Sequence, residues 1–333
     1  MKVCVIYGGM STEHEVSLQS SKNVIDNLDK DKYKIYPVFI DKNGEWIHND
    51  KKLKDIVEFL SKMDVVFPVL HGKYGEDGTI QGMLELLKIP YVGCNVLSSS
   101  LCMDKVYAKF MFEKANINQA KYIYIKDENI YVNEELDETR LENDEIVKLV
   151  EEKLKFPVFV KPANSGSSVG VKKANNGPEL IVALQNASIY DRKVLIEEEI
   201  VGKEVECAVL GNNYPQASTV GEIIAADTFY TYDAKYNNKE SKIKIPANID
   251  EAKIDEIRKI AVKAFKALDC VGLARVDFFV QKDTNKVYLN EINTMPGFTE
   301  ISMYPKLWEY SGLSYKELLN KLIECALDNV KRK

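Results

Sequence analysis

The sequence predicts a fold of mixed α/β and α+β class, with a parallel sheet in its first third and antiparallel strands after it. In the first third, short apolar runs typical of buried strands alternate with amphipathic helical patterns. Strands are expected at 2–7, 34–40 and 64–70, and helices at 14–28 and 79–88. From residue 158 onward, short strands follow one another with tight turns and fewer helices between them, a pattern typical of antiparallel sheets.

The composition is that of a globular protein with an ordinary core. The 333 residues are enough for two or three packed lobes, and 45% of them are hydrophobic and 29% charged. The formal net charge of -6 gives no reason to expect a nucleic-acid partner. No apolar run has the length of a membrane span, and the first one meets Gly8 and Gly9 at a turn, so neither a membrane segment nor a signal peptide is expected. Six scattered cysteines without a CxxC pair favour reduced thiols in a cytoplasmic protein.

The later elements include one segment that is rich in acidic residues and one loop of unusual composition. A helix over 104–116 leads into the acidic segment, 126–152, which we interpret as an exposed excursion followed by a helix. The loop over 227–247 is too polar for a core and too aromatic for an inert linker, which indicates a functional loop. A helix over 250–268 and two terminal helical segments are also expected. The later strands are expected at 158–162, 169–173, 193–198, 204–210 and 219–224, with a hairpin of 274–280 and 286–292 around a turn at 283–286.

Four polar residues fall on this hairpin in a pattern that indicates a metal site. Arg275 and Asp277 are two apart and share one face of a strand, and Glu291 and Asn293 share one face of the next. Pairing of the two strands would bring three oxygen ligands together, as Mg²⁺ prefers. The alternative is a solvated sheet face. The apolar neighbours of these residues favour the metal site, because unpaired acids on buried strands would be destabilising.

A loop of small residues suggests a phosphate site near this metal. Lys161 ends a strand and is followed by the small residues of 163–170, whose backbone N–H groups could approach phosphate oxygens, while Lys105 could add a second positive charge. The Walker order is missing, so the loop could also be an ordinary turn. Glu197 and Glu204 could accept hydrogen bonds from adenine or ribose, although on their own they are better interpreted as surface carboxylates.

Seven motifs in order give the sequence a specific resemblance. They are GGMSTEHEVS, HGKYGEDGTIQGMLE, MDKVYAK, KPANSGSSVGV, TFYTYDAKY, ARVDFF and NEINTMPGFTEISMYP. Together they resemble the D-alanine–D-alanine ligase family of the ATP-grasp superfamily, over nearly the whole chain from Lys2 to Leu327. The resemblance implies an ATP-grasp fold with an N-terminal parallel-sheet substrate domain (1–103), a central small α+β subdomain (104–204) and a C-terminal mixed-sheet subdomain (205–333). The last would hold the metal site and a lid loop, 227–246.

The resemblance also implies roles for single residues around the amino-acid substrates. Glu13 matches the anchor of the first D-alanine's ammonium group, and Ser167 and Tyr236 match the hydroxyl groups that complete a triad with it. His71 matches a histidine beside the first amino acid. Arg275 and the backbone of Gly297 match the groups that stabilise the tetrahedral intermediate. Ser302 matches a contact to the carboxylate of the second substrate.

Other matches concern the nucleotide and the metal. The positions that match nucleotide-binding residues are Lys105, Lys161, Ser168, Glu197, Glu204 and Lys235. Asp277, Glu291 and Asn293 match ligands of two Mg²⁺ ions, with Mn²⁺ as an alternative metal. The implied reaction joins two D-alanines at the expense of ATP, through an acyl phosphate, for peptidoglycan precursors in the cytoplasm. A homodimer is what the family suggests.

Two positions bear on the second substrate, and a third departs from the family pattern. Relatives that make D-alanyl-D-lactate tend to replace the loop tyrosine, which is present here as Tyr236. Relatives that use D-serine tend to carry arginine where Met303 stands, so both positions favour D-alanine. Thr231 stands where the family usually has Asp, which is a departure within the lid.

The sequence also bears on three alternative functions. A nicotinamide-dependent dehydrogenase lacks support because GxGxxG does not follow the first strand. A different ATP-grasp ligase, with another amino-acid or peptide acceptor, is the main alternative. A catalytically silent nucleotide-binding regulator is disfavoured by the intact set of lysines, metal ligands and Arg275.

Overall fold

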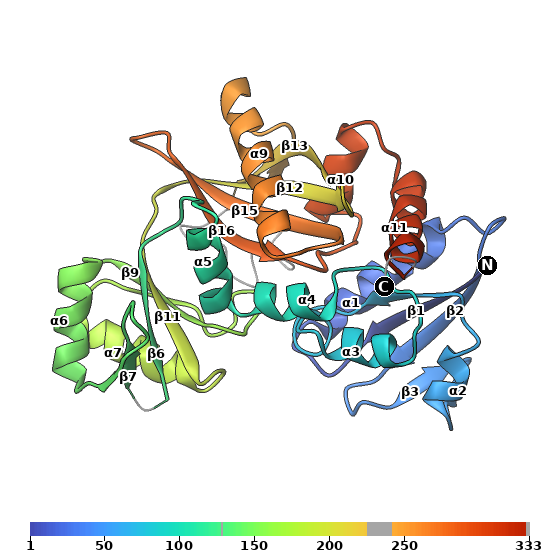
Figure 1. Ribbon diagram of the computed structural model, residues 1–333, viewed down its shortest axis with the longest axis horizontal. Coiled ribbons are helices and arrows are strands. Elements are labelled where there is room, and N and C mark those ends of the chain that lie inside the picture. Colours follow the sequence, from blue (N-terminus) through green and yellow to red (C-terminus); the bar gives the residue numbers. More distant parts are fainter. Residues whose placement is uncertain (128, 225–241, 331–333) are drawn as a thin grey trace.

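Three sheets, each in its own lobe, make up the protein (Figure 1). The computed structural model describes residues 1–127, 129–224 and 242–330. The expected class, α/β followed by α+β, is confirmed. Among the described residues no helix is long and apolar enough to cross a membrane.

The first sheet has the parallel strands that the sequence predicts, and two short antiparallel strands, β3 and β4, extend it at one edge. Its strand order is β4-β3-β2-β1-β5, and β1 pairs in parallel with both β2 and β5. Gly8 ends β1 at a φ of +90°, and a Cβ there would lie 2.2 Å from the carbonyl oxygen of Ile40, so only glycine fits this close turn. The elements are β1 (Lys2–Gly8), α1 (His14–Asn27), β2 (Lys34–Ile40), β3 (Trp46–His48), β4 (Lys51–Lys52), α2 (Ile56–Leu60), β5 (Val65–Val69) and α3 (Thr79–Leu86).

Two short helices connect the first sheet to the rest of the chain: α4 (Val96–Met103) and α5 (Lys105–Lys114). Each has a side-chain cap, since Asn95 accepts from the N–H of Ser98 and Asp104 accepts from the N–H groups of Val106 and Tyr107. Cys102 of α4 and Phe112 of α5 belong to the same apolar core as the third sheet. The two connectors therefore fix the position of Lys105, which begins α5.

The second sheet has the order β10-β9-β11-β6-β7-β8, and its pairings are antiparallel. The interpretation of 126–152 as an excursion was wrong in part, because β7 and β8 extend the sheet before the expected helix. Both strands have only three residues, and β8 is exposed at the edge, so no apolar alternation marks them. Sequence analysis also did not identify α7. The elements are β6 (Tyr122–Lys126), β7 (Ile130–Val132), β8 (Glu138–Arg140), α6 (Asn143–Lys153), β9 (Val158–Pro162), β10 (Lys172–Ala174), α7 (Gly177–Ser188) and β11 (Lys193–Glu198).

The third sheet carries the predicted hairpin. Its order is β14-β13-β12-β15-β16, with antiparallel neighbours, and a single parallel bridge joins Leu289 of β16 to Gln119. One apolar core lies between this sheet and α9. The elements are β12 (Gly202–Gly211), β13 (Gln216–Ile224), β14 (Lys242–Lys244), α9 (Glu251–Ala267), β15 (Gly272–Gln281), β16 (Val287–Asn293), α10 (Met303–Tyr310) and α11 (Tyr315–Val330).

The last helix returns to the first lobe. In Figure 1 the red α11 lies beside the blue strands and helices. Leu318, Leu319 and Leu322 of α11 share one buried core with Val3 and Val5 of β1. The first and third lobes are thus joined by a common apolar core, and residues of both face the cavity that follows.

Candidate active site

A cavity of about 640 Å³ gathers most of the predicted site residues. Segments from all three lobes line it, including the turn before α1, the small-residue loop after β9 and the ends of β15 and β16. The predicted residues that line it are Glu13, His71, Lys105, Ser167, Arg275, Glu291, Asn293, Gly297 and Ser302. Residues far apart in the sequence therefore meet at one site.

The hairpin places its polar residues together as predicted. Arg275 is the register partner of Asn293, and Asp277 is the partner of Glu291. The Asn293 amide donates to Asp277 Oδ2 at 3.0 Å. The Arg275 guanidinium donates to both oxygens of Asp277, each at 2.7 Å. The predicted common face is confirmed.

Arg275 has a further acidic partner that sequence analysis missed. Its Nε lies 2.9 Å from Oε2 of Glu206, on the neighbouring strand β12. Burial opposes the charge of Arg275, but Asp277 and Glu206 raise its pKa still further above the ordinary range. Arg275 is therefore a permanent cation, held by two carboxylates at the edge of the cavity.

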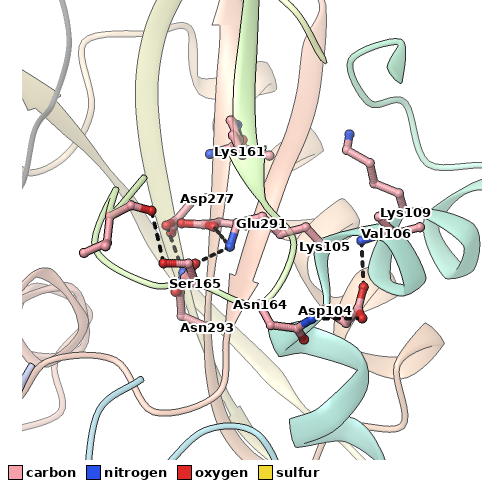
Figure 2. A network of polar contacts seen from close by, with 12 residues as sticks. Asp104, Lys105, Val106, Lys109, Lys161, Asn164, Ser165, Asp277, Glu291 and Asn293 are labelled. Atoms are coloured by element: carbon pink, nitrogen blue, oxygen red, sulfur yellow. Dashed lines mark hydrogen bonds and ion pairs between the residues drawn. The ribbon is translucent and has the colours of Figure 1, made fainter. Parts of the chain in front are cut away.

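Lys105 connects the small-residue loop to the acidic hairpin. Its Nζ donates to the carbonyl oxygen of Ser165 at 2.7 Å and lies 3.6 Å from Glu291 Oε2. Figure 2 shows Lys105 reaching from α5 to both groups. In the loop, Ser167 and Ser168 have φ values of 50° and 60°, so the backbone turns sharply beside this lysine. The loop and Lys105 thus form one side of the same cavity.

Asp277, Glu291 and Asn293 offer oxygen donors from two adjacent strands. Among the described residues no three His, Cys, Asp or Glu side chains cluster as a metal-binding group, and here only two of the three predicted ligands are acids. Arg275 and Lys105 lie against these acids. The amide nitrogen of Asn293 donates to Asp277, so its amide oxygen is the atom that could bind a metal. A few hard oxygen donors on neighbouring strands fit a cation such as Mg²⁺, which keeps several waters.

Lys161 belongs to a buried triad with Glu197 and Lys109. Glu197 Oε1 lies 2.6 Å from the Nζ of Lys109, and its Oε2 lies 2.5 Å from the Nζ of Lys161. Burial raises the pKa of Glu197, but the two lysines outweigh burial and lower it to about 2. Both carboxylate oxygens of Glu197 therefore bind lysines. The sequence had suggested instead that Glu197 accepts hydrogen bonds from adenine or ribose.

Lys109 was missed by the sequence reasoning. Its side chain is 2% exposed, one turn after Lys105 on α5, and its Nζ also lies over the ring of Tyr122. Burial lowers its pKa, and Glu197 offsets that effect in part. A lysine on the otherwise apolar face of an amphipathic helix is the signal that could have identified it.

The remaining predicted nucleotide positions are spread along nearby strands and loops. Glu204 lies on β12, opposite Ile223 and Phe279. Ser168 follows Ser167 in the small-residue loop. Lys235, Tyr236 and Thr231 lie outside the described residues, as does most of the predicted lid, 227–246. Lys242 and Ile243, just after that segment, line the cavity.

Glu13 is held at the start of α1 by two glycines and a serine. The Ser167 hydroxyl donates to Glu13 Oε1, in agreement with the predicted pairing. A Cβ on Gly72 would lie 2.5 Å from Glu13 Oε2, and a Cβ on Gly166 would lie 2.7 Å from it. Both loops therefore need a residue without a side chain to leave room for this carboxylate.

His71 is buried and neutral. It is 3% exposed, and burial lowers its pKa. Its Nδ1 lies 2.9 Å from the carbonyl oxygen of Met295, which only accepts, so Nδ1 carries the proton. Its Nε2 is then an acceptor, 3.1 Å from the hydroxyl of Ser20. The ring lines the cavity in one fixed orientation.

Glu76 is a second acid in the cavity that sequence analysis overlooked. Its carboxyl oxygens accept from the N–H of Gly72 at 2.8 Å and from the N–H of Met295 at 3.1 Å. Burial and the nearby Glu13 raise the pKa of Glu76 to about 8. Its place in the HGKYGEDG motif, five residues after His71, was the available signal.

Gly297 and Ser302 face each other at the end of the cavity. A Cβ on Gly297 would lie 2.7 Å from Ser302 Oγ. That hydroxyl oxygen accepts from the N–H of Thr299 at 2.9 Å and lies 2.8 Å from the Thr299 hydroxyl. These contacts fix the turn between β16 and α10, and Gly297 of this turn lines the cavity.

Two family models match the chain. The one described as D-ala D-ala ligase C-terminus matches residues 111–324, and the one described as D-ala D-ala ligase N-terminus matches residues 2–59 and 50–94. The chain belongs to the D-alanine–D-alanine ligase family. The family resemblance stated from the sequence is thus confirmed.

Relatives of this family resemble the chain over its whole length. A D-alanine–D-alanine ligase of Acetivibrio thermocellus is 51% identical, covering 99% of this chain and 98% of the relative. The crystal structure of VanG D-Ala:D-Ser ligase from Enterococcus faecalis is 38% identical, with a TM-score of 0.86 over 98% of this chain and 99% of that one. A D-alanine–D-alanine ligase from Bacillus anthracis complexed with ATP is 34% identical, with a TM-score of 0.79 over 100% and 99% of the two chains. The fold is the ATP-grasp fold of these ligases.

Proposed function

We propose that this chain is a D-alanine–D-alanine ligase, which uses ATP to join two D-alanines for peptidoglycan synthesis. The observation that carries the proposal is that one cavity is lined by the Glu13–Ser167 pair, by Arg275 and Gly297, and by Glu291 and Asn293 of β16. A zwitterion needs an acid for its ammonium group, and its carboxylate needs cations nearby before it can take up a phosphoryl group. The family relatives named above support the same reaction.

The first half of the reaction activates a carboxylate. The γ-phosphoryl group of ATP passes to the carboxylate of the first D-alanine, giving an acyl phosphate and ADP. Donor and acceptor are both anions, so positive charge and positioning supply most of the rate enhancement. Lys105 and Lys161 are the described cations that serve the phosphates, and Lys235 of the lid is proposed to join them.

Asp277, Glu291 and Asn293 are the residues that would hold divalent metal. Two Mg²⁺ ions are proposed, with Mn²⁺ as a substitute, because the donors are hard oxygens on neighbouring strands. When bound, the metal would neutralise phosphate charge. Lys105 and Arg275 offset the charge of these acids in the structure, so both side chains are close enough to share the phosphate or carboxylate of a substrate.

The second half is attack of an amine on the acyl phosphate. The ammonium group of the second D-alanine loses a proton, and its nitrogen then bonds to the acyl carbon, where an oxyanion develops. The carbon–oxygen bond to phosphate breaks, the nitrogen gives up a second proton, and hydrogen phosphate leaves. Arg275 and the N–H of Gly297 are proposed to stabilise that oxyanion, where one such donor is typically worth about 3 kcal/mol. Glu13, with Ser167 and Tyr236, holds the first ammonium group beside the neutral His71. Ser302 binds the second carboxylate.

Further features of the family are proposed for the whole chain. The chain divides into 1–103, 104–204 and 205–333, each centred on one of the three sheets. Residues 227–246 act as a lid that excludes water from the acyl phosphate. The enzyme works in the cytoplasm as a homodimer.

D-serine is the second candidate for the attacking amino acid. The solved D-Ala:D-Ser ligase that resembles this chain favours considering it. Met303, 4% exposed at the start of α10, lines the cavity directly after Ser302. Its apolar side chain offers no hydrogen bond to a serine hydroxyl, so D-alanine is preferred.

Phosphate release from ATP and dipeptide formation test the function together. With Mg²⁺ present, D-alanine should stimulate both, whereas L-alanine, D-serine and D-lactate should stimulate neither comparably. Chelation of the metal should abolish both activities and added Mg²⁺ should restore them. In Glu291→Gln the Mg²⁺ concentration for half-maximal rate should rise at least about tenfold, while the exposed Glu309→Gln on α10 should match the parent. Phosphate release that ignores every amino acid would reject the proposal.

A further inference from the structure

The main chain on both sides of Gly297 is held by side chains of the first lobe. Two residues before it, the N–H of Met295 donates to Glu76 at 3.1 Å, and the Met295 carbonyl accepts from His71 at 2.9 Å. One residue after it, the N–H of Phe298 donates to the hydroxyl oxygen of Ser20 at 3.1 Å. Gly297 thus lies between two anchored peptide groups whose anchors belong to another lobe.

Ser20 is connected to both anchors. It lies on α1, is fully buried, and its Oγ is 3.1 Å from Nε2 of His71. Since His71 carries its proton on Nδ1, the Ser20 hydroxyl donates to Nε2 and its lone pair accepts from the N–H of Phe298. One hydroxyl therefore holds Phe298 directly and, through His71, fixes the carbonyl of Met295.

We propose that Ser20 is a positioning residue that aims the Gly297 N–H at the oxyanion of the tetrahedral intermediate. The proposal rests on the proposed function, in which Gly297 supplies that hydrogen bond. The oxyanion donor gains its rate effect from being oriented before the charge develops, so a loosened peptide loses rate without losing substrate. Arg275, the other donor, is held by Asp277 and Glu206 of the third sheet and does not depend on Ser20.

A purely structural serine would behave differently. It would satisfy the buried N–H of Phe298, and its loss would lower stability without a selective effect on the second chemical step. The distinguishing readouts are kcat against KM, and the amount of dipeptide formed per phosphate released. When attack by the amine slows, water has longer to hydrolyse the acyl phosphate, and this ratio falls.

Ser20→Ala tests the proposal, with Ser21→Ala as its matched control. Ser21 is its neighbour on α1, 1% exposed, and its hydroxyl donates within the helix, to the carbonyl of Leu18 at 3.0 Å. For Ser20→Ala, kcat should fall about tenfold or more and the dipeptide-to-phosphate ratio should fall with it. KM for ATP and D-alanine should stay within about twofold.

Ser20→Cys keeps a side chain of similar shape but with a weaker hydrogen-bonding group. If the alanine variant does not fold, kcat and the dipeptide-to-phosphate ratio are measured on the cysteine variant. Parental kcat and ratio in the folded variant would overturn the proposal, as would an equal loss of kcat in Ser21→Ala. Failure of the parent enzyme to make any dipeptide would instead reject the proposed function. The two ideas can therefore fail separately.

Discussion

Lys109 and Glu197 form an ion pair of 2.6 Å with side chains that are 2% and 5% exposed. The second oxygen of Glu197 binds Lys161, so the one carboxylate connects a buried helix face to a lysine of the proposed nucleotide site. A charge group this deep depends on each of its members, because a partner left alone would stay buried without compensation.

Replacing Lys109 by methionine should therefore weaken both stability and ATP binding. Removing one member of a buried pair typically costs about 3–5 kcal/mol. Without Lys109, the ion pair of Glu197 with Lys161 should draw Lys161 away from the phosphates, so KM for ATP should rise. Lys114→Met, at the exposed end of α5, is the control and should change stability by less than about 0.5 kcal/mol. Denaturant unfolding measures the change in stability, and ATP titration measures the change in ATP affinity. Parental ATP affinity in Lys109→Met would exclude a role of Lys109 in nucleotide binding.

Arg275→Lys should separate the oxyanion role from nucleotide binding. Lysine keeps the charge between Asp277 and Glu206, but it lacks the planar fork that binds both oxygens of Asp277. We expect kcat to fall about 100-fold, while ATP affinity changes only a few-fold. Arg258→Lys, on the exposed surface of α9, is the control and should change neither kcat nor ATP affinity. Equal losses in kcat and ATP affinity would contradict the oxyanion role.

Gly166→Ala should impair capture of the first D-alanine. The new methyl group would lie 2.7 Å from Glu13 Oε2 and displace the carboxylate, although the Gly166 backbone itself is not in the left-handed region. KM for D-alanine should rise about tenfold or more, with ATP affinity unchanged. Gly82→Ala is the control, because a Cβ in α3 there meets nothing within 4 Å. It should keep parental kinetics and gain a little stability, since alanine favours helix.

Glu76 should make the stability of the ligand-free enzyme depend on pH. Its pKa is about 8 in the folded protein against an ordinary 4.5, with burial as the main cause. The folded state thus keeps a proton that the unfolded chain has lost, and this stabilising contribution is complete below pH 4.5 and disappears as the pH rises through 8. Between pH 5 and 8.5, Glu76→Gln should gain in melting temperature relative to the parent. Glu58→Gln, at an exposed position of α2, should show no such gain. If the melting-temperature difference between Glu76→Gln and the parent stayed constant over this pH range, the raised pKa of Glu76 would be excluded.

The hairpin site was predictable from sequence because its geometry is local. Alternation along two strands and one short turn are enough to bring Asp277, Glu291 and Asn293 together. The family motifs added Glu13 and Ser167, which are 154 residues apart and pair as expected. In both cases a pattern in the chain carried the information.

The missed residues depend on contacts that no local pattern records. Glu76 meets Met295 across 219 positions, and Ser20 meets Phe298 across 278. The apolar face of α5 marks Lys109 as unusual, but the sequence does not show that its partner is the buried Glu197. Strands β7 and β8 were hidden for another reason, since each has only three residues, too few to show an apolar alternation, and those of β8 are polar and exposed at the sheet edge.

The contact of α11 with β1 has a consequence for biosynthesis. Val3 and Val5 are synthesised long before Leu318, Leu319 and Leu322, yet all five residues belong to one apolar core. The core of the first lobe can therefore be completed only after α11 has emerged from the ribosome. Until then its apolar surface is open to chaperones, and a chain truncated before Tyr315 would keep that surface exposed permanently.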